Sequence, residues 1–274
     1  MDPATIGGIL VAFGSLLVMA FLEGASPMAL ILPAPMILVF GGSIGVGLAS
    51  TVLPEAINAV KTLPKAFLYK RVAATKTIDQ LVELAEVARK QGLLALEAEA
   101  AKITDDFLKK ALQNTADGMD ADELRTVMED EAATRDRVGR ASSKFFNSLG
   151  GFAPTVGIIG TVVSLTHVLE NLSNPATLGH SIAGAFVATL WGVMSANFIW
   201  LPIGGRIGKM TDLESERLAI VIEGVLAVQG GAQPRVLGEK LLAMVPVHEQ
   251  GKGAAKGAKA GGKKAAAPQA AAAA

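Results

Sequence analysis

Between Phe145 and Leu169 the chain reads FFNSLGGFAPTVGIIGTVVSLTHVL and contains no Asp, Glu, Lys or Arg. Three further stretches lack these residue types, namely Pro3–Leu22, Gly24–Pro54 and Asn171–Gly205. A transmembrane helix needs about 20 mainly apolar residues to cross roughly 30 Å of hydrocarbon. Each stretch is long enough, so the sequence predicts four membrane-spanning helices, over about 4–22, 29–52, 149–170 and 182–203.

The composition of the 274 residues agrees with a membrane protein. Hydrophobic residues make up 51% and charged residues only 18%, against roughly 25% charged residues in a soluble domain. The 25 Lys and Arg residues balance the 25 Asp and Glu residues, which argues against a protein that binds nucleic acid. Cysteine is absent, so a disulfide scaffold and a cysteine-ligated metal site are excluded. We expect no metal site and no enzyme, because no nucleophile with a base, metal-ligand spacing or phosphate-binding loop is found.

The distribution of Lys and Arg predicts the topology. All 25 of these residues lie within Lys61–Lys144 or Arg206–Lys264, and the short connections between the apolar stretches contain none. Basic residues near the ends of spans remain in the cytoplasm. We therefore expect an all-α membrane protein with two transmembrane hairpins, a helical cytoplasmic domain between spans two and three, and both termini in the cytoplasm.

The cytoplasmic segments carry helical patterns. Thr77 with Gln80 matches a capping box, and an apolar stripe follows until Gly92. Further helices are expected at about 93–114, from Asp120 into span three, at 211–229 and at 237–245. The chain then divides into a first hairpin (1–55), a cytoplasmic helical domain (56–148), a second hairpin (149–205), C-terminal cytoplasmic helices (206–249) and a low-complexity, disordered tail (250–274). The Lys residues of this tail either keep it soluble or contact anionic membrane lipids.

Glu170 lies at the outer end of the third predicted span, and no Asp or Glu lies in the interior of any predicted span, although an intramembrane Asp or Glu usually marks an ion pathway. A chain of this kind carries no proton relay by itself. If it moves ions, a partner must supply the carboxylate.

Two prolines and two threonines stand out in the last two spans. Pro154 and Thr161 are seven residues apart and lie on nearly the same helical face. Thr189 is placed near mid-depth and Pro202 at the inner end of span four. A carbonyl freed by proline beside a Thr hydroxyl can line a narrow hydrated path. Ordinary helix packing explains the same residues, so the pattern alone leaves both interpretations open.

Three stretches, taken together, resemble a known family. They are ARKQGLLALE (Ala88–Glu97), GGFAPTVGIIGTVVSL (Gly150–Leu165) and EGVLAVQGGAQPRVLGEKLL (Glu223–Leu242). In this order, on four predicted spans, the chain resembles the flagellar motor stator subunits of the MotA type, within the MotA/TolQ/ExbB group. The similarity covers about residues 4–246.

The resemblance implies a function in the bacterial inner membrane. Five A subunits are expected to surround two copies of a MotB-type subunit, whose single span brings the ion-binding Asp. Translocated H⁺ or Na⁺ would pass along the A–B interface, with no other cofactor. The A ring would then turn and push the rotor's switch-complex protein. A proton is the expected ion, although the sequence leaves both ions open.

The resemblance also implies roles for six residues. Pro154 and Pro202 match prolines that couple ion binding to conformational change, and Thr161 and Thr189 match positions that line the ion cavity. Arg89 and Glu97 match the charged pair that contacts the rotor. The neighbouring Lys90 and Glu99 share this position on the surface, so their part in the contact stays open.

A TolQ/ExbB-like energiser of envelope transport is the alternative. Members of that branch have three spans, of which one precedes the cytoplasmic domain. Two predicted spans precede the domain in this chain, which favours the MotA type.

Overall fold

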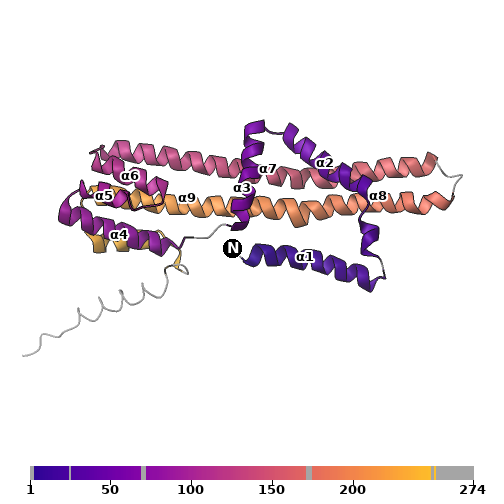
Figure 1. Cartoon of the computed structure of the whole chain (residues 1–274), viewed down its shortest axis with the longest axis horizontal. Helices are drawn as coiled ribbons and strands as arrows, with labels where there is room; N and C mark the ends of the chain where they lie inside the picture. Colours follow the sequence, from indigo (N-terminus) through magenta and orange to yellow (C-terminus); the bar gives the residue numbers. More distant parts are fainter. Residues whose placement is uncertain (1–2, 25, 69–71, 171–174, 248–249, 251–274) are drawn as a thin grey trace, which may run out of the picture. The chain divides into compact units, whose positions relative to one another are not determined.

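A computed structural model describes residues 3–24, 26–68, 72–170, 175–247 and 250. Every regular element in these ranges is a helix, as the sequence predicts (Figure 1). In chain order the helices are α1 (Pro3–Leu22), the 3₁₀-helix η1 (Pro27–Leu30), α2 (Pro33–Ala49), α3 (Leu53–Leu68), α4 (Ala74–Gln91), α5 (Ala95–Ala100), α6 (Asp106–Ala116), α7 (Ala121–Glu170), α8 (Pro175–Ser195), the π-helix η2 (Ala196–Trp200), α9 (Leu201–Gln229) and α10 (Pro234–Leu242).

The chain forms two compact units. The first unit contains residues 1–70 and 135–213, and the second contains residues 71–134 and 214–274. Both long helices, α7 and α9, contribute residues to each unit.

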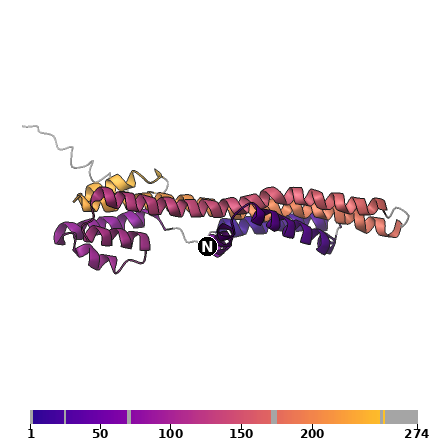
Figure 2. The same cartoon turned by 90° about the horizontal axis from the view of Figure 1, so that it is seen from above.

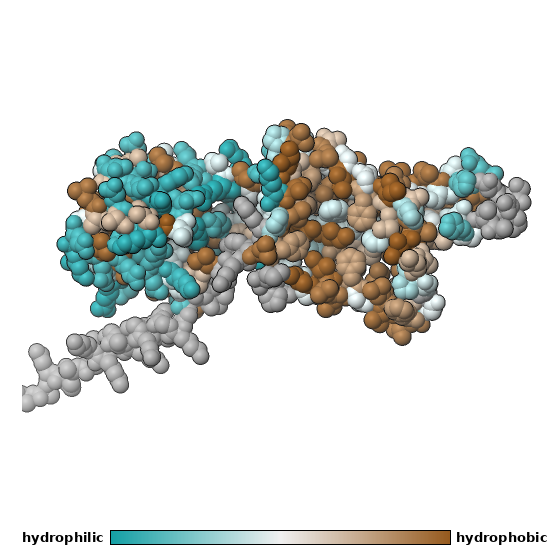
Figure 3. All heavy atoms as spheres, viewed as in Figure 1, coloured by the Kyte–Doolittle hydropathy of each residue, from teal (hydrophilic) through white to brown (hydrophobic). Residues whose placement is uncertain are grey.

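Within the described ranges, three helical stretches are long and apolar enough to cross a membrane. They lie in α1, in α7 and in the continuous run from Leu178 to Gln229, and α2 is a shorter apolar helix. Apolar residues cover the visible surface of α1, α2 and α8, whereas polar residues dominate the visible surface of the second unit (Figure 3). The apolar stretches found in the sequence therefore do form helices.

The second predicted span begins later than expected. The helix α2 starts at Pro33 and not near residue 29, because Leu32 is extended, with φ −110° and ψ 118°. A residue that precedes proline is disfavoured in the helical region, and proline itself suits the first helical position. The preceding 3₁₀-helix η1 is hydrogen-bonded to α8, since the indole N–H of Trp191 donates to the carbonyl of Leu30 at 2.7 Å.

Aromatic and small side chains form the core of the first unit. Phe145, Phe146 and Leu149 of α7 share a buried cluster with Ile203 and Ile207 of α9 and with three alanines of α3. The rings of Phe145 and Phe146 pack edge to face, with centroids 5.4 Å apart, which is a favourable aromatic geometry. This cluster packs the middle of α7 and the first turns of α9 against α3.

Leucines from six helices form the core of the second unit. Buried members are Leu81 (α4), Leu96 (α5), Leu112 (α6), Leu124 (α7), Leu218 (α9) and Leu237 (α10). The apolar stripe predicted after Thr77 is confirmed by the burial of Ile78, Leu81 and Leu84.

Two predictions for the second unit are wrong. The capping box fails because α4 already begins at Ala74 and buries Thr77 in its interior. The helix expected at 93–114 is divided into α5 and α6 because the side chain of Asp105 accepts the N–H of Leu108 at 2.9 Å and caps α6. This cap satisfies the backbone N–H of Leu108, which in a continuous helix would donate to a backbone carbonyl instead.

Candidate functional site

Helices α7 and α8 touch at two glycines. A Cβ atom on Gly157 would lie 2.9 Å from the carbonyl oxygen of Ala188 and 3.0 Å from Cα of Gly192. A Cβ atom on Gly192 would lie 2.8 Å from the carbonyl oxygen of Ala153. Only glycine allows this approach, and small residues commonly mark such contacts between membrane helices. Figure 2 shows α8 alongside the C-terminal part of α7.

The close approach brings Thr161 and Thr189 together, as members of one hydrogen-bonded cluster. Their hydroxyls are hydrogen-bonded to each other. The Oγ1 atom of Thr161 also lies 3.1 Å from the carbonyl oxygens of Gly157, on its own helix, and of Ala185, on α8. Because a hydroxyl has one proton, Thr161 donates to one of these acceptors at a time. The cluster therefore bridges the two helices and has more hydrogen-bond acceptors than protons.

Pro154 lies within an unbroken helix. The helix α7 continues from Ala121 to Glu170 across it, so the carbonyl of Gly150 loses the backbone donor that a non-proline residue would provide. The next residue, Thr155, is exposed and donates its hydroxyl to the carbonyl of Phe152 at 2.7 Å. Thr155 is a candidate residue of an ion pathway that the sequence alone did not single out. Its position directly after Pro154 is the feature that could have identified it.

Pro202 follows a π-helical turn. Helices α8 and α9 are joined by η2, and the N–H of Leu201 donates to the carbonyl of Ala196, five residues earlier. The ring of a proline clashes with the carbonyl four residues before it in a regular α-helix. The wider turn accommodates the ring without ending the helix, and single π turns of this kind are frequent at functional sites. No sequence pattern predicted this turn.

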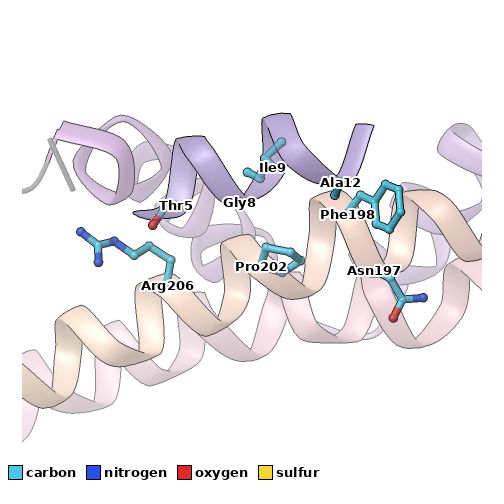
Figure 4. Close-up of a pocket in the computed structure, with 8 residues that line it drawn as sticks. All are labelled: Thr5, Gly8, Ile9, Ala12, Asn197, Phe198, Pro202 and Arg206. Carbon is cyan, nitrogen blue, oxygen red and sulfur yellow. The ribbon is translucent and has the colours of Figure 1, made fainter. Parts of the chain in front are cut away.

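Pro202 borders a groove of about 440 Å³ in the first unit (Figure 4). Residues of α1 form one side, and residues of η2 and α9 form the other. The lining residues are Thr5, Gly8, Ile9, Ala12, Asn197, Phe198, Pro202 and Arg206. The helix at Pro202 is thus not held by close packing on this side, which leaves room for it to bend.

One face of α7 is apolar and exposed in the first unit. Ile158, Ile159, Val162 and Val163 are each more than half exposed. Large exposed apolar surfaces mark contacts with protein or lipid. The cluster of Thr161 and Thr189 lies between helices, next to this face but not on it.

Arg89 and Glu97 flank the turn between α4 and α5 in the second unit. Arg89 lies in the last turn of α4 and Glu97 in the first turn of α5, and both are exposed. Gly92 ends α4 with φ +85°, a conformation that glycine adopts without strain. Among the described residues, neither Arg89 nor Glu97 makes an ion pair, whereas Lys90 pairs with Glu86 at 3.2 Å and Glu99 pairs with Lys102 at 2.7 Å.

Two ion-pair networks hold the second unit together. Glu223 of α9 accepts from Lys240 of α10 at 2.9 Å and from Arg125 of α7 at 3.0 Å. These hydrogen bonds, led by that of Lys240, lower the pKa of the Glu223 carboxyl. Arg217 of α9 pairs with Asp105 at 2.7 Å and is largely buried, so Asp105 both caps α6 and ties it to α9.

Comparison with known proteins agrees with this architecture. The family model of the MotA/TolQ/ExbB proton channel family matches residues 99–219. Motility protein A of Bacillus subtilis (strain 168) is 33% identical over 269 residues, which cover 96% of this chain and 98% of that protein.

Two solved structures share the fold. The structure of C. jejuni MotAB has a TM-score of 0.86 at 30% identity, covering 90% of this chain and 97% of that chain. The flagellar MotAB stator complex from Bacillus subtilis has a TM-score of 0.82 at 32% identity, covering 89% of this chain and 97% of that chain. With helical architecture and sequence shared over nearly the whole length, the chain belongs to the MotA-type flagellar stator subunits of the MotA/TolQ/ExbB proton channel family.

Proposed function

We propose that the chain is a flagellar motor stator subunit that forms an ion channel with a MotB-type partner and converts ion flow into torque. The observation that carries this function is the Thr161–Thr189 cluster, a hydroxyl relay between stretches of α7 and α8 that contain no Asp or Glu (Phe145–Leu169 and Pro175–Ser195). A relay without a titrating acid needs one from a partner. The MotAB composition of the similar solved structures supports such a partner.

The topology follows from the apolar helices and the basic residues. Four spans form two hairpins in the bacterial inner membrane, with both termini in the cytoplasm. The helix α2 has 17 residues, which is about 25 Å at 1.5 Å per residue, and η1 extends the apolar stretch. The segments 56–148 and 206–249 then lie in the cytoplasm, and the tail 250–274, apart from Gln250, falls outside the described residues.

The assembly is a ring of five copies around two B subunits. The exposed apolar face of α7, with Ile158 and Val162, supports burial in such an assembly, because a lone chain leaves it uncovered. Each B subunit brings one Asp on a single span, and ions reach it along the A–B interface. One charge that moves through about 150 mV releases roughly 3.5 kcal/mol, which is enough for repeated small rotations.

Pro154 and Pro202 couple ion binding to movement. Pro154 removes a backbone hydrogen bond near the relay, and Pro202 adjoins the π turn and the groove. Ion binding at the B-subunit Asp then shifts α7 or α8. This shift is transmitted to the cytoplasmic part of α7 and, through η2, to α9. Arg89 and Glu97 are the cytoplasmic charges that meet the rotor's switch-complex protein.

Removal of the protein tests the function directly. A deletion strain should lose motility and keep an intact envelope, and the full-length chain should restore swimming. Lost envelope integrity with normal motility would contradict the stator function and favour a TolQ/ExbB-like energiser.

A double substitution tests the rotor contact. Arg89→Ala with Glu97→Ala should leave the amount of complex in the membrane unchanged and lower the stall torque of tethered cells, because the two exposed charges are lost. The matched control is Lys90→Ala with Glu99→Ala, whose charges are paired within their own segments. Normal torque in the first double variant would refute the contact.

A further inference from the structure

Helix α3 crosses α7 and α9 within the first unit and does not run along them (Figure 1). Its buried residues Ala56, Ala59 and Ala66 belong to the aromatic cluster that contains Phe145. Phe145 is the first residue of the charge-free stretch of α7, and Arg206 directly follows the charge-free stretch that ends in α9. Since charged residues resume where a span leaves the membrane, α3 lies across the spans at the level of the membrane surface.

A second side of α3 is apolar and exposed. Leu53, Ile57, Val60 and Leu68 are between 46% and 66% exposed. Successive spacings of four, three and eight residues place these side chains along one side of the helix. The described part of the chain leaves this side uncovered, and an exposed apolar surface of this kind marks a contact with protein or lipid.

Polar residues occupy the remaining side of α3. Asn58 and Lys61 are exposed, and Lys61 makes no ion pair with a described residue. Glu55 accepts the hydroxyl of Thr51 at 2.9 Å and lies in the first turn of the helix, where a negative charge is favourable. The helix therefore has one side packed on α7 and α9, one apolar side without a partner, and one polar side with an unpaired lysine.

The charge of this segment indicates what covers the apolar side. Between residues 53 and 72, the sequence has one acidic residue, Glu55, and four basic residues, Lys61, Lys65, Lys70 and Arg71. The cytoplasmic leaflet of a membrane is negatively charged and attracts basic segments. A helix with an apolar side and a basic polar side lies in the plane of the membrane surface. An anionic lipid surface thus matches the position, the direction and the charge of α3.

We propose that α3 is a binding site for the headgroups of anionic phospholipids in the inner leaflet. This inference rests on the proposed membrane topology. Leu53, Ile57 and Val60 enter the boundary of the acyl chains, and Lys61 reaches the headgroup phosphate while its aliphatic part stays on the apolar surface. Because α3 packs on α7 and α9, bound lipid stabilises the part of the first unit where both helices leave the membrane.

Spin labels test how α3 meets the membrane. The chain contains no cysteine, so Val60→Cys and Asn58→Cys each provide one attachment site on it. The labelled complex with its B subunit is placed in vesicles of phosphatidylcholine and phosphatidylglycerol. We expect the label at position 60 to be accessible to oxygen, which dissolves in hydrocarbon, and the label at position 58 to a water-soluble nickel complex. A label at position 60 that meets the nickel complex, or neither reagent because a neighbouring copy covers it, would overturn the proposal.

Lipid dependence of the Tm tests the headgroup contact. Phosphatidylglycerol should raise the Tm of the purified complex in neutral detergent more than phosphatidylcholine with the same acyl chains, and added salt should weaken the difference. In Lys61→Gln, about five-fold more phosphatidylglycerol should be needed for half of the effect, because one basic residue at the surface is lost. Lys61→Arg keeps the charge and should behave as the unsubstituted chain.

The matched control is Lys76→Gln. Lys76 is also exposed but lies on α4 in the second unit, so its loss should leave the lipid dependence unchanged. Equal effects of the two lipids, or an unchanged requirement for phosphatidylglycerol in Lys61→Gln, would overturn the proposal. Either result in a complex that still restores swimming to a deletion strain would leave the stator function intact, so the two failures are distinguishable.

Discussion

The hydroxyls of Thr161 and Thr189 meet although the two residues belong to different helices. Each residue was a separate candidate in the sequence, and only the crossing of α7 and α8 makes them one cluster. Gly157 and Gly192 permit that crossing, because a side chain on either would collide with backbone of the other helix. The sequence shows glycines in both spans, but it does not tell which of them face each other.

The cluster predicts that its two threonines act as a unit. Thr161→Val removes the hydroxyl that bridges α7 and α8, and Thr189→Val removes its partner. We expect each variant to lower swimming speed, and the double variant to be no slower than the worse single variant, because residues in one network are not additive.

The control for this prediction is Thr166→Val. Thr166 is exposed and, within the part of the chain that the structure describes, bonds only the carbonyl of Val162 on its own helix, at 2.9 Å, so its loss should leave speed unchanged. Speeds are compared at equal amounts of membrane-inserted protein. Independent, additive losses in Thr161→Val and Thr189→Val would refute a shared role.

At the scale of helices, Pro202 and the π turn are linked. Substitution of Pro202 by Ala restores a backbone donor and removes the ring, so the regular α-helix becomes accessible. We expect slower hydrogen exchange of the Ala196–Leu201 amides and lower torque in Pro202→Ala, because a regular helix bends less at this point.

Pro234→Ala is the matched control for Pro202→Ala. Pro234 begins α10, where the missing N–H has no acceptor within the helix, so torque and exchange in η2 should not change. Unchanged exchange in Pro202→Ala would mean that the π turn does not depend on the proline.

Glu223 joins three helices of the second unit, and its pKa makes that junction sensitive to pH. Hydrogen bonds from Lys240 and Arg125 lower the pKa of the carboxyl from an ordinary value of about 4.3. A group whose pKa is lowered by folding stabilises the folded state above the unfolded pKa and loses this effect as pH falls through the folded pKa.

We therefore expect Glu223→Gln to lower the Tm of the purified complex at pH 7. The difference from the unsubstituted protein should shrink as pH falls below about 4. Glu239→Gln is the control, since its pair with Arg235 is well exposed on both sides and such pairs contribute little. A Tm difference that is constant from pH 7 to acid pH would contradict the role of the Glu223 charge.

At the scale of the whole molecule, the arrangement of oxygen atoms bears on which ion drives the motor. A sodium ion is bound by several oxygen atoms, whereas the hydroxyls of Thr161 and Thr189 are already engaged with each other and with backbone carbonyls. We expect a proton-driven motor: a protonophore should stop swimming, and external sodium should not change its speed. Swimming that persists with the protonophore and rises with sodium would show the opposite.

Most helices could be predicted from the sequence, but the breaks between them could not. The helix from Asp120 into the third apolar stretch is confirmed as the single helix α7. The break between α5 and α6 was missed because Asp105 reads equally well as a helical residue, and its cap depends on the backbone conformation.

The length of the stretches without charged residues and the helical periodicity are local properties of a chain. They were therefore enough to predict a membrane protein built of helices, and three motifs in order were enough to predict the family. The Thr161–Thr189 cluster and the π turn before Pro202 required the folded structure. The cluster arises where two helices approach within the reach of a hydrogen bond, and the π turn arises where the helix widens beside a proline ring. Neither the distance between two helices nor the width of a helical turn can be read from one segment of the sequence.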